Sequence, residues 1–233
     1  MRIFLDAGHN HAGADIGAQS NGFKEQDITY AIAQKVGERL KNADISVKYS
    51  RNSITESVGS TLAESINLRC KLANVWEAHY FVSIHCNAFS DAAANGTETL
   101  IYSKGGDAEK LARKVDARLV KLNLTNRGVK VRTDLGVLRG TNMPAILIET
   151  AFITNAGDRF LLSFKQDELA QAITNGIFEF FGLEVKTVVE TAEQAIIKLV
   201  QKGIINSPDY WIGACEVVKN LDALFIKFAN AMI

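Results

Sequence analysis

Several features that mark other classes of protein are missing from this sequence. It has only three cysteines, without a Cys-x-x-Cys pair, so we expect free thiols and not a disulfide framework. No apolar run approaches the roughly 20 residues that a membrane helix needs, so we expect no membrane insertion. The 26 basic and 26 acidic residues cancel, which argues against a nucleic-acid partner.

Size and composition indicate a globular protein of one large domain, or of one medium domain with a small appendage. The chain has 233 residues, of which 47% are hydrophobic and 22% are charged. The composition shifts near Gly182. We therefore predict a main domain over residues 1–183, a linker over 184–190 and a small helical domain over 191–233.

In the main domain, strand patterns alternate with helix patterns. We expect strands over 2–6, 45–50, 80–84, 97–102, 129–132 and 144–148, and helices over 24–41, 61–78, 106–122 and 166–181. This alternation predicts an α/β fold with a mainly parallel sheet and helices on both faces. The active site of such a sheet is expected beyond the carboxyl ends of its strands.

The last 40 or so residues carry apolar stripes at helical spacing. One stripe begins at Ala192 and stops at Gly203. A second helix should begin with Ser207 as N-cap, Pro208 in the first helical position and Asp209 in the first turn, and its stripe continues to the end of the chain.

Four polar residues are predicted to meet at one edge of the sheet. His9 follows the first predicted strand and His85 ends the third. Glu149 directly follows the apolar strand over 144–148. Glu25 opens the first helix, where the helix dipole favours a carboxylate. Taken singly, each histidine has a structural or solvated explanation, and Glu25 is an ordinary charge at a helix N-terminus.

Taken together, these residues favour a metal site. Two histidines and a glutamate are a common ligand set for catalytic zinc, and the remaining carboxylate can act as a general base. Glu149 suits the base, because the apolar strand that leads to it should partly desolvate its carboxylate and raise its pKa.

Five motifs, in order, resemble the zinc-dependent N-acetylmuramoyl-L-alanine amidases of the Amidase_3 type over about residues 2–181. They are Leu5-Asp6-Ala7-Gly8-His9, Asp15-Ile16-Gly17-Ala18, Leu68-Arg69 with Ala73-Asn74, Ser83-Ile84-His85-Cys86-Asn87-Ala88, and Met143-Pro144-Ala145-Ile146-Leu147-Ile148-Glu149. The resemblance implies a mixed sheet flanked by helices. It also implies one zinc ion bound by His9, Glu25 and His85, and a catalytic Glu149.

The resemblance further implies hydrolysis of the amide between N-acetylmuramic acid and L-alanine in bacterial peptidoglycan. Asn87 and Arg139 are weaker candidates for substrate contacts. A zinc peptidase that cuts another wall amide and a non-catalytic wall-binding module are the alternatives.

The chain departs from many relatives at Asn10-His11, where they have Gly-Gly, and at Cys86, which we expect to be buried and unreactive.

The C-terminal helical domain and the start of the chain bear on where such an enzyme would act. An endolysin-like or clostridial-type architecture implies a helical module either for wall binding or for self-association, and in the second case a homo-oligomer formed through the C-terminal helices. We see no signal peptide at the N-terminus. We therefore expect a protein made in the cytoplasm that reaches the wall by holin-type release, or one secreted by a signal that lies outside this sequence.

Overall fold

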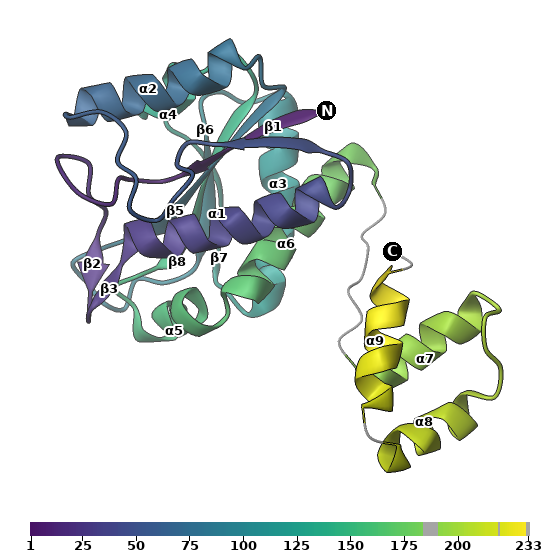
Figure 1. The fold of residues 1–233 in the computed structure, drawn as a ribbon. Coiled ribbons are helices and arrows are strands. Elements are labelled where there is room, and N and C mark those ends of the chain that lie inside the picture. The colour runs from purple at the N-terminus through teal and green to yellow at the C-terminus, as the bar shows by residue number, and fades with distance from the viewer. Residues whose placement is uncertain (184–190, 219, 232–233) are drawn as a thin grey trace. The chain divides into compact units, whose positions relative to one another are not determined.

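The chain divides into two compact units, Met1–Leu183 and Glu184–Ile233. The structure is a computed structural model and describes residues 1–183, 191–218 and 220–231 (Figure 1). The predicted linker, 184–190, lies outside the described residues. Each unit is described by itself.

The first unit is built around a six-stranded sheet with the order β4-β1-β5-β8-β6-β7. Its strands are β1 (Arg2–Ala7), β4 (Ser46–Tyr49), β5 (Tyr80–Asn87), β6 (Thr97–Ile101), β7 (Asn126–Val131) and β8 (Ala145–Phe152). Strands β4, β1, β5 and β8 pair in parallel, whereas β6 is antiparallel to β8 and parallel to β7. The predicted mixed, mainly parallel sheet is therefore confirmed.

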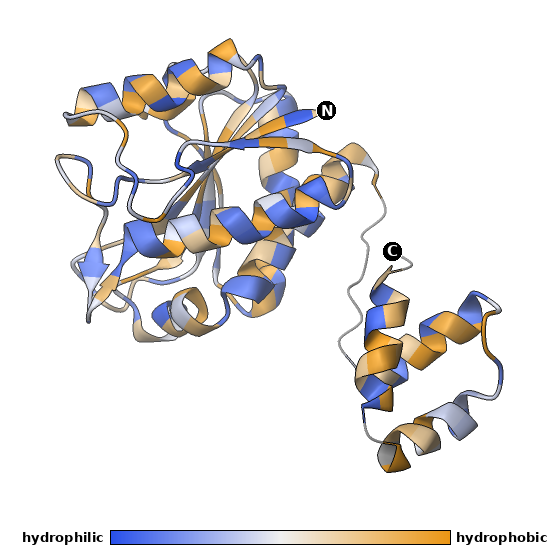
Figure 2. Ribbon diagram, viewed as in Figure 1, coloured by the Kyte–Doolittle hydropathy of each residue, from blue (hydrophilic) through white to orange (hydrophobic). Residues whose placement is uncertain are grey.

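Helices cover both faces of this sheet (Figure 1). One face carries α2 (Leu62–Val75) and the short α4 (Gly136–Arg139), and the other carries α1 (Glu25–Lys41), α3 (Asp107–Leu119) and α6 (Gln166–Phe181). A 3-10 turn (Val120–Leu122) follows α3, and α5 (Ala156–Phe164) follows β8. Hydrophobic and hydrophilic residues alternate around these helices (Figure 2), as expected where one side of a helix packs on a core.

Two central strands are longer than the sequence pattern indicates. Strand β5 runs to Asn87 and β8 runs to Phe152, so His85 and Glu149 lie inside strands and not at their ends. The pairing of β5 with β8 extends through these residues: His85 and Glu149 are register partners, and after an irregularity Asn87 pairs with Phe152. The pattern failed here because polar side chains interrupt the apolar runs.

A small hairpin precedes α1, in a stretch rich in glycine, asparagine and alanine that carries no strand pattern. Its strands are β2 (Gln19–Ser20) and β3 (Phe23–Lys24), joined by Asn21 and Gly22 with φ of 50° and 82°. Two successive positive φ angles are typical of the type I′ turn that Asn-Gly favours. The hairpin ends where α1 begins, so it fixes the position of Glu25.

The second unit contains three helices among its described residues, α7 (Ala192–Gln201), α8 (Pro208–Val217) and α9 (Leu221–Ala231). Ala195, Leu199 and Ala229 form its buried centre, with Phe225 packed against them. The Thr191 hydroxyl accepts from the Gln194 backbone N–H at the start of α7, and the Gln194 side chain completes a capping box.

The predicted start of α8 is confirmed, because Ser207 is its N-cap residue, Pro208 opens the helix and Asp209 lies in its first turn. The Ser207 side chain makes no capping hydrogen bond, and its backbone lies in the left-handed region with φ of 56°. The expectation for the apolar stripe was wrong, because the stripe does not run unbroken to the end. It is interrupted between α8 and α9, where Asn220 has φ of 65°. In the part of the chain that the structure describes, no helix is both long and apolar enough to cross a membrane.

Candidate metal centre

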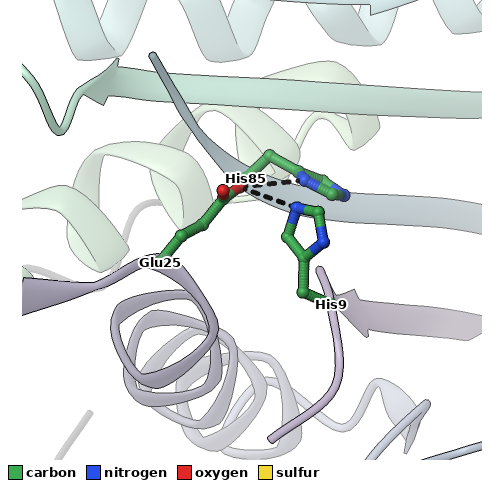
Figure 3. Close-up of side chains that lie close together, drawn as sticks. All are labelled: His9, Glu25 and His85. Carbon is green, nitrogen blue, oxygen red and sulfur yellow. Dashed lines mark hydrogen bonds and ion pairs between the residues drawn. The ribbon is translucent and has the colours of Figure 1, made fainter. Parts of the chain in front are cut away.

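His9, Glu25 and His85 converge at one edge of the sheet, with the Glu25 carboxylate facing both imidazoles (Figure 3). Glu25 Oε1 lies 3.2 Å from His9 Nε2 and 3.1 Å from His85 Nδ1. Among the described residues this is the one group of three or more potential metal ligands, and its ligand atoms lie within 4.8 Å of one another.

Each ligand comes from a different element. His9 follows β1 in the left-handed conformation with φ of 67°, which is uncommon for a residue with a side chain. Glu25 is the first residue of α1, and His85 lies on β5. The Glu25 carboxylate is itself held by backbone N–H groups, because Ala18 N donates to Oε2 at 2.8 Å and Cys86 N donates to Oε1 at 2.9 Å.

Two glycines allow this close convergence. A Cβ atom on Gly8 would lie 2.5 Å from Cε1 and Nε2 of His85, and a Cβ atom on Gly17 would lie 2.7 Å from Cβ of Glu25. Both distances are far below van der Waals contact. A side chain at either position would therefore displace a ligand.

A buried charge network orients His9. The Asp15 carboxylate contacts His9 Nδ1 at 3.0 Å and accepts from Arg69 Nη2 at 2.8 Å. Arg69 also donates from Nη1 to Asp6 Oδ2 at 3.1 Å, and the Arg69 side chain is only 3% exposed. With Nδ1 occupied by Asp15, His9 presents Nε2 to the centre, which is the arrangement commonly found for metal-binding histidines.

The network also sets the charges at the site. Burial opposes protonation of His9, but hydrogen bonds with Asp15 and Glu25 outweigh burial and raise its pKa to about 9. Burial alone would raise the pKa of Glu25, yet hydrogen bonds with His85 and His9 hold that pKa well below its usual range. These contacts thus favour an ionised Glu25 carboxylate beside a protonated His9.

This donor set fits a divalent metal ion such as zinc. Ligand bonds of about 2.1 Å at tetrahedral angles place ligand atoms about 3.4 Å apart. The separations of 3.2 and 3.1 Å from Glu25 Oε1 to the two imidazole nitrogens are close to that value. The donors are two imidazoles and one carboxylate, so a fourth position would be open to water.

Glu149 stands beside the triad without belonging to it. It is the register partner of His85 on the neighbouring strand, and its Oε2 atom is buried without a hydrogen-bond partner among the described residues. Burial raises the pKa of Glu149 to about 7, against the opposing effect of the nearby His85. Glu149 is therefore suited to exchange protons near neutral pH.

Comparison with known proteins agrees with this geometry. Residues 3–179 match the family model described as N-acetylmuramoyl-L-alanine amidase. The chain belongs to this family. It is 37% identical to the endolysin of Bacillus phage SPP1 over 79% of this chain and 68% of that protein. The sporulation-specific N-acetylmuramoyl-L-alanine amidase of Bacillus subtilis is 31% identical over 96% of this chain and 79% of that protein.

A solved structure supports the same assignment. The crystal structure of the N-acetylmuramoyl-L-alanine amidase from Clostridium difficile 630 superposes with a TM-score of 0.68 and 34% sequence identity. It covers 78% of this chain and 96% of that one. The predicted resemblance, fold and enzyme class are thus confirmed, and the chain is an N-acetylmuramoyl-L-alanine amidase by class.

Asn87, Arg139 and Cys86, which the sequence also indicates, lie outside the triad. The Asn87 amide nitrogen donates to Glu98 Oε1 at 3.1 Å, next to Glu149. Arg139 is exposed at the end of α4, outside the triad. Cys86 is buried, and burial raises the pKa of its thiol well above the ordinary value, as its predicted inertness requires. All three cysteines are free.

The departure from Gly-Gly after His9 has a structural explanation. The Asn10 side chain forms two hydrogen bonds with the Val58 backbone, donating from Nδ2 to the carbonyl and accepting at Oδ1 from the N–H, each at 2.9 Å. It thereby ties the loop after His9 to the segment that precedes α2.

Sequence reasoning missed the roles of Asp15 and Glu98. A signal for Asp15 was present, because it lies in one of the five motifs. Glu98 is a charged residue inside a short strand, and burial of such a residue requires a partner, which is the one signal that the sequence contains.

Proposed function

We propose that this chain hydrolyses the amide bond between N-acetylmuramic acid and L-alanine in peptidoglycan, with one zinc ion held by His9, Glu25 and His85. The observation that carries the proposal is the placement of Glu149 beside this triad, in register with His85 and with a buried carboxylate oxygen that has no partner in the described part of the chain. When bound, zinc supplies Lewis-acid polarisation of the carbonyl and lowers the pKa of a bound water from ~16 to ~7.

The protein's own residues then have distinct roles. Glu149 accepts a proton from the attacking water while the oxygen of that water forms a bond to the carbonyl carbon. The same carboxyl group returns the proton to the leaving nitrogen as the carbon–nitrogen bond breaks, which frees the stem peptide with L-alanine at its N-terminus. Asp15 keeps the Nε2 atom of His9 directed at the metal.

Asn87 and Arg139 are proposed as substrate contacts, since Asn87 donates to Glu98, the register partner of Glu149, and Arg139 is exposed at the end of α4. The second unit is proposed as a module for wall binding or self-association. Several of its apolar side chains are half or more exposed, among them Tyr210 at 68%, Leu224 at 61% and Phe228 at 51%. The site of action is the cell wall, reached by holin-type release or by secretion.

Digestion of purified peptidoglycan tests the proposal. The protein is incubated with the wall with and without a chelator, and the newly formed peptide N-termini are identified. The proposal expects L-alanine N-termini that are lost with chelator and restored by zinc. Other N-termini would replace it with a zinc peptidase, and no release by zinc-loaded protein would replace it with a wall-binding module.

The variant Glu149→Gln, run in parallel, separates catalysis from binding. It should abolish release while the protein still binds zinc and the wall. Glu168→Gln is the matched control, because Glu168 is an exposed glutamate on α6 that pairs with Lys165.

A further inference from the structure

A cluster of charged residues lies on the side of Glu149 away from the triad. Glu98 on β6 is the direct register partner of Glu149 across the antiparallel β6–β8 pair, so both side chains lie on the same face of the sheet. Glu98 Oε2 accepts from Arg127 Nε at 3.0 Å and from Lys130 Nζ, and both cations come from β7. The cluster has one carboxylate and two cations, so its net charge is positive.

The guanidinium of Arg127 is held in place by contacts that occupy some of its hydrogen-bond donors. Its Nε atom is bound to Glu98, its Nη1 atom contacts the Asn95 carbonyl at 3.4 Å, and its Cζ atom lies 4.9 Å from the centre of the Phe152 ring. Nη2 has no hydrogen-bond partner among the described residues. The side chains of Arg127 and Lys130 are 35% and 45% exposed. An oriented guanidinium with a free donor, next to an ammonium group, favours a carboxylate ligand.

The order of the strands indicates which part of the substrate reaches this cluster. The sheet runs β1-β5-β8-β6-β7, so His9 and His85 lie on one side of Glu149, and Arg127 and Lys130 lie on the other. The group that protonates the leaving nitrogen must come within hydrogen-bond reach of it. If the muramoyl carbonyl faces the triad, the leaving nitrogen lies at Glu149 and the departing peptide is directed over β6 and β7.

The spacing agrees with this direction. Neighbouring strands lie about 4.8 Å apart, so β7 is about 10 Å from β8. An extended peptide spans that distance in about three residues at roughly 3.3 Å each.

We propose that Arg127, assisted by Lys130, binds a carboxylate of the stem peptide within the first three residues beyond the cleaved amide. Glu98 acts as a positioning residue that holds both cations in place. This inference rests on the proposed function and deepens it. It makes the chain selective for wall peptides whose acidic groups are free over peptides in which they are amidated.

The test compares two synthetic N-acetylmuramoyl tripeptides, identical except that the acidic groups of one are converted to primary amides. For the zinc-loaded protein, kcat/KM should be about tenfold higher for the acidic substrate, mainly through KM, as one charge-assisted hydrogen bond provides. In Arg127→Gln the two values should come within about twofold. An unchanged preference in Arg127→Gln, or no preference in the unaltered protein, would overturn the inference.

The two proposals fail differently. If the unaltered protein cuts neither tripeptide, the proposed function fails; if it cuts both equally well, only the carboxylate site fails. Arg113→Gln is the matched control and should keep the full preference, because Arg113 is an exposed arginine that pairs with Glu109 on α3. Lys130→Gln, at a more exposed side chain, should reduce the preference in part, and it keeps the test decisive if Arg127→Gln does not fold.

Discussion

The two sides of Glu149 hold their charges in different ways. On the side of β1 and β5, Arg69 is buried and bonded to both Asp6 and Asp15, and the network ends on a triad ligand, His9. On the side of β6 and β7, Arg127 and Lys130 share the single carboxylate of Glu98 and remain partly exposed. A closed network fixes the geometry of its own members, whereas an open one keeps donors for a ligand. The first arrangement suits metal binding and the second suits substrate recognition.

The largest expected effect lies between the two regions, at Glu149. Glu149→Gln keeps the size of the side chain but removes the base, so we expect kcat to fall by about 10³-fold. Zinc affinity should stay within about threefold, because Glu149 is outside the triad. Steady-state kinetics on a muramoyl peptide and a zinc titration measure both. A zinc-loaded variant that kept more than a tenth of the activity would show that Glu149 is not the base.

On the metal side, Gly8→Ala should weaken zinc binding by about 10- to 100-fold. The added Cβ atom would lie 2.5 Å from the His85 ring, which must move away. Competition with a chromophoric chelator measures the affinity. The control is Gly157→Ala on α5, where the nearest atom to the added Cβ is Asn155 Oδ1 at 3.4 Å. Equal affinities in the two variants would contradict the packing described for His85.

The pH dependence should report Glu149 on the acid side. Burial raises its pKa to about 7, and a bound cation would lower that value because it favours the carboxylate. Since the base acts as a carboxylate, kcat should be full above this pKa. It should fall about tenfold per pH unit below it, with the midpoint between about pH 5.5 and 7. A zinc-saturated protein with constant kcat from pH 5 to 8 would exclude this role.

The smallest expected effect is on stability, at the Asp116 carboxylate of α3, which forms no ion pair with the described residues of either charge network. Burial raises the pKa of Asp116 to about 6, although the Thr99 hydroxyl donates to it at 2.6 Å. A raised carboxyl pKa contributes stability below the unfolded value, and that stability is lost as the pH rises through 6. Asp116→Asn should therefore increase the free energy of unfolding at pH 8 by about 1–2 kcal/mol.

Denaturant unfolding at two pH values checks this prediction. The gain should shrink at pH 4.5, where Asp116 is protonated in the folded state. Asp107→Asn, at an exposed aspartate on the same helix, should show no such gain. A gain that is the same at both pH values would assign the effect to something other than titration of Asp116.

The same contrast explains what could be predicted from the sequence. The repeating apolar pattern predicted the six-stranded sheet and its main helices, because burial of alternate or helically spaced residues leaves a signal in the sequence. The convergence of His9, Glu25 and His85 could be predicted from their residue types and from the common edge of the sheet at which β1, α1 and β5 place them. The full lengths of β5 and β8 could not be predicted, because His85 and Glu149 are strand residues that face the site and not the core.

The two charge clusters could not be predicted from the sequence for another reason. Asp15 and Arg69 are 54 residues apart, and Glu98 and Arg127 are 29 apart, so only the fold brings each pair together. The antiparallel direction of β6 places Glu98 opposite Glu149, and no local pattern in the sequence encodes that direction. The hairpin before Glu25, in contrast, could be predicted, because Asn21-Gly22 is a sequence that favours a type I′ hairpin turn.

One pair of variants tests most directly whether the two sides of Glu149 have separate roles. Asp15→Asn and Arg127→Gln are compared in zinc affinity and in the preference for the acidic over the amidated tripeptide. Asp15→Asn should weaken zinc binding by about 10- to 100-fold and keep the substrate preference at saturating zinc. Arg127→Gln should lose the preference and bind zinc as the unaltered protein does. A loss of zinc affinity in Arg127→Gln as large as that in Asp15→Asn would contradict the account.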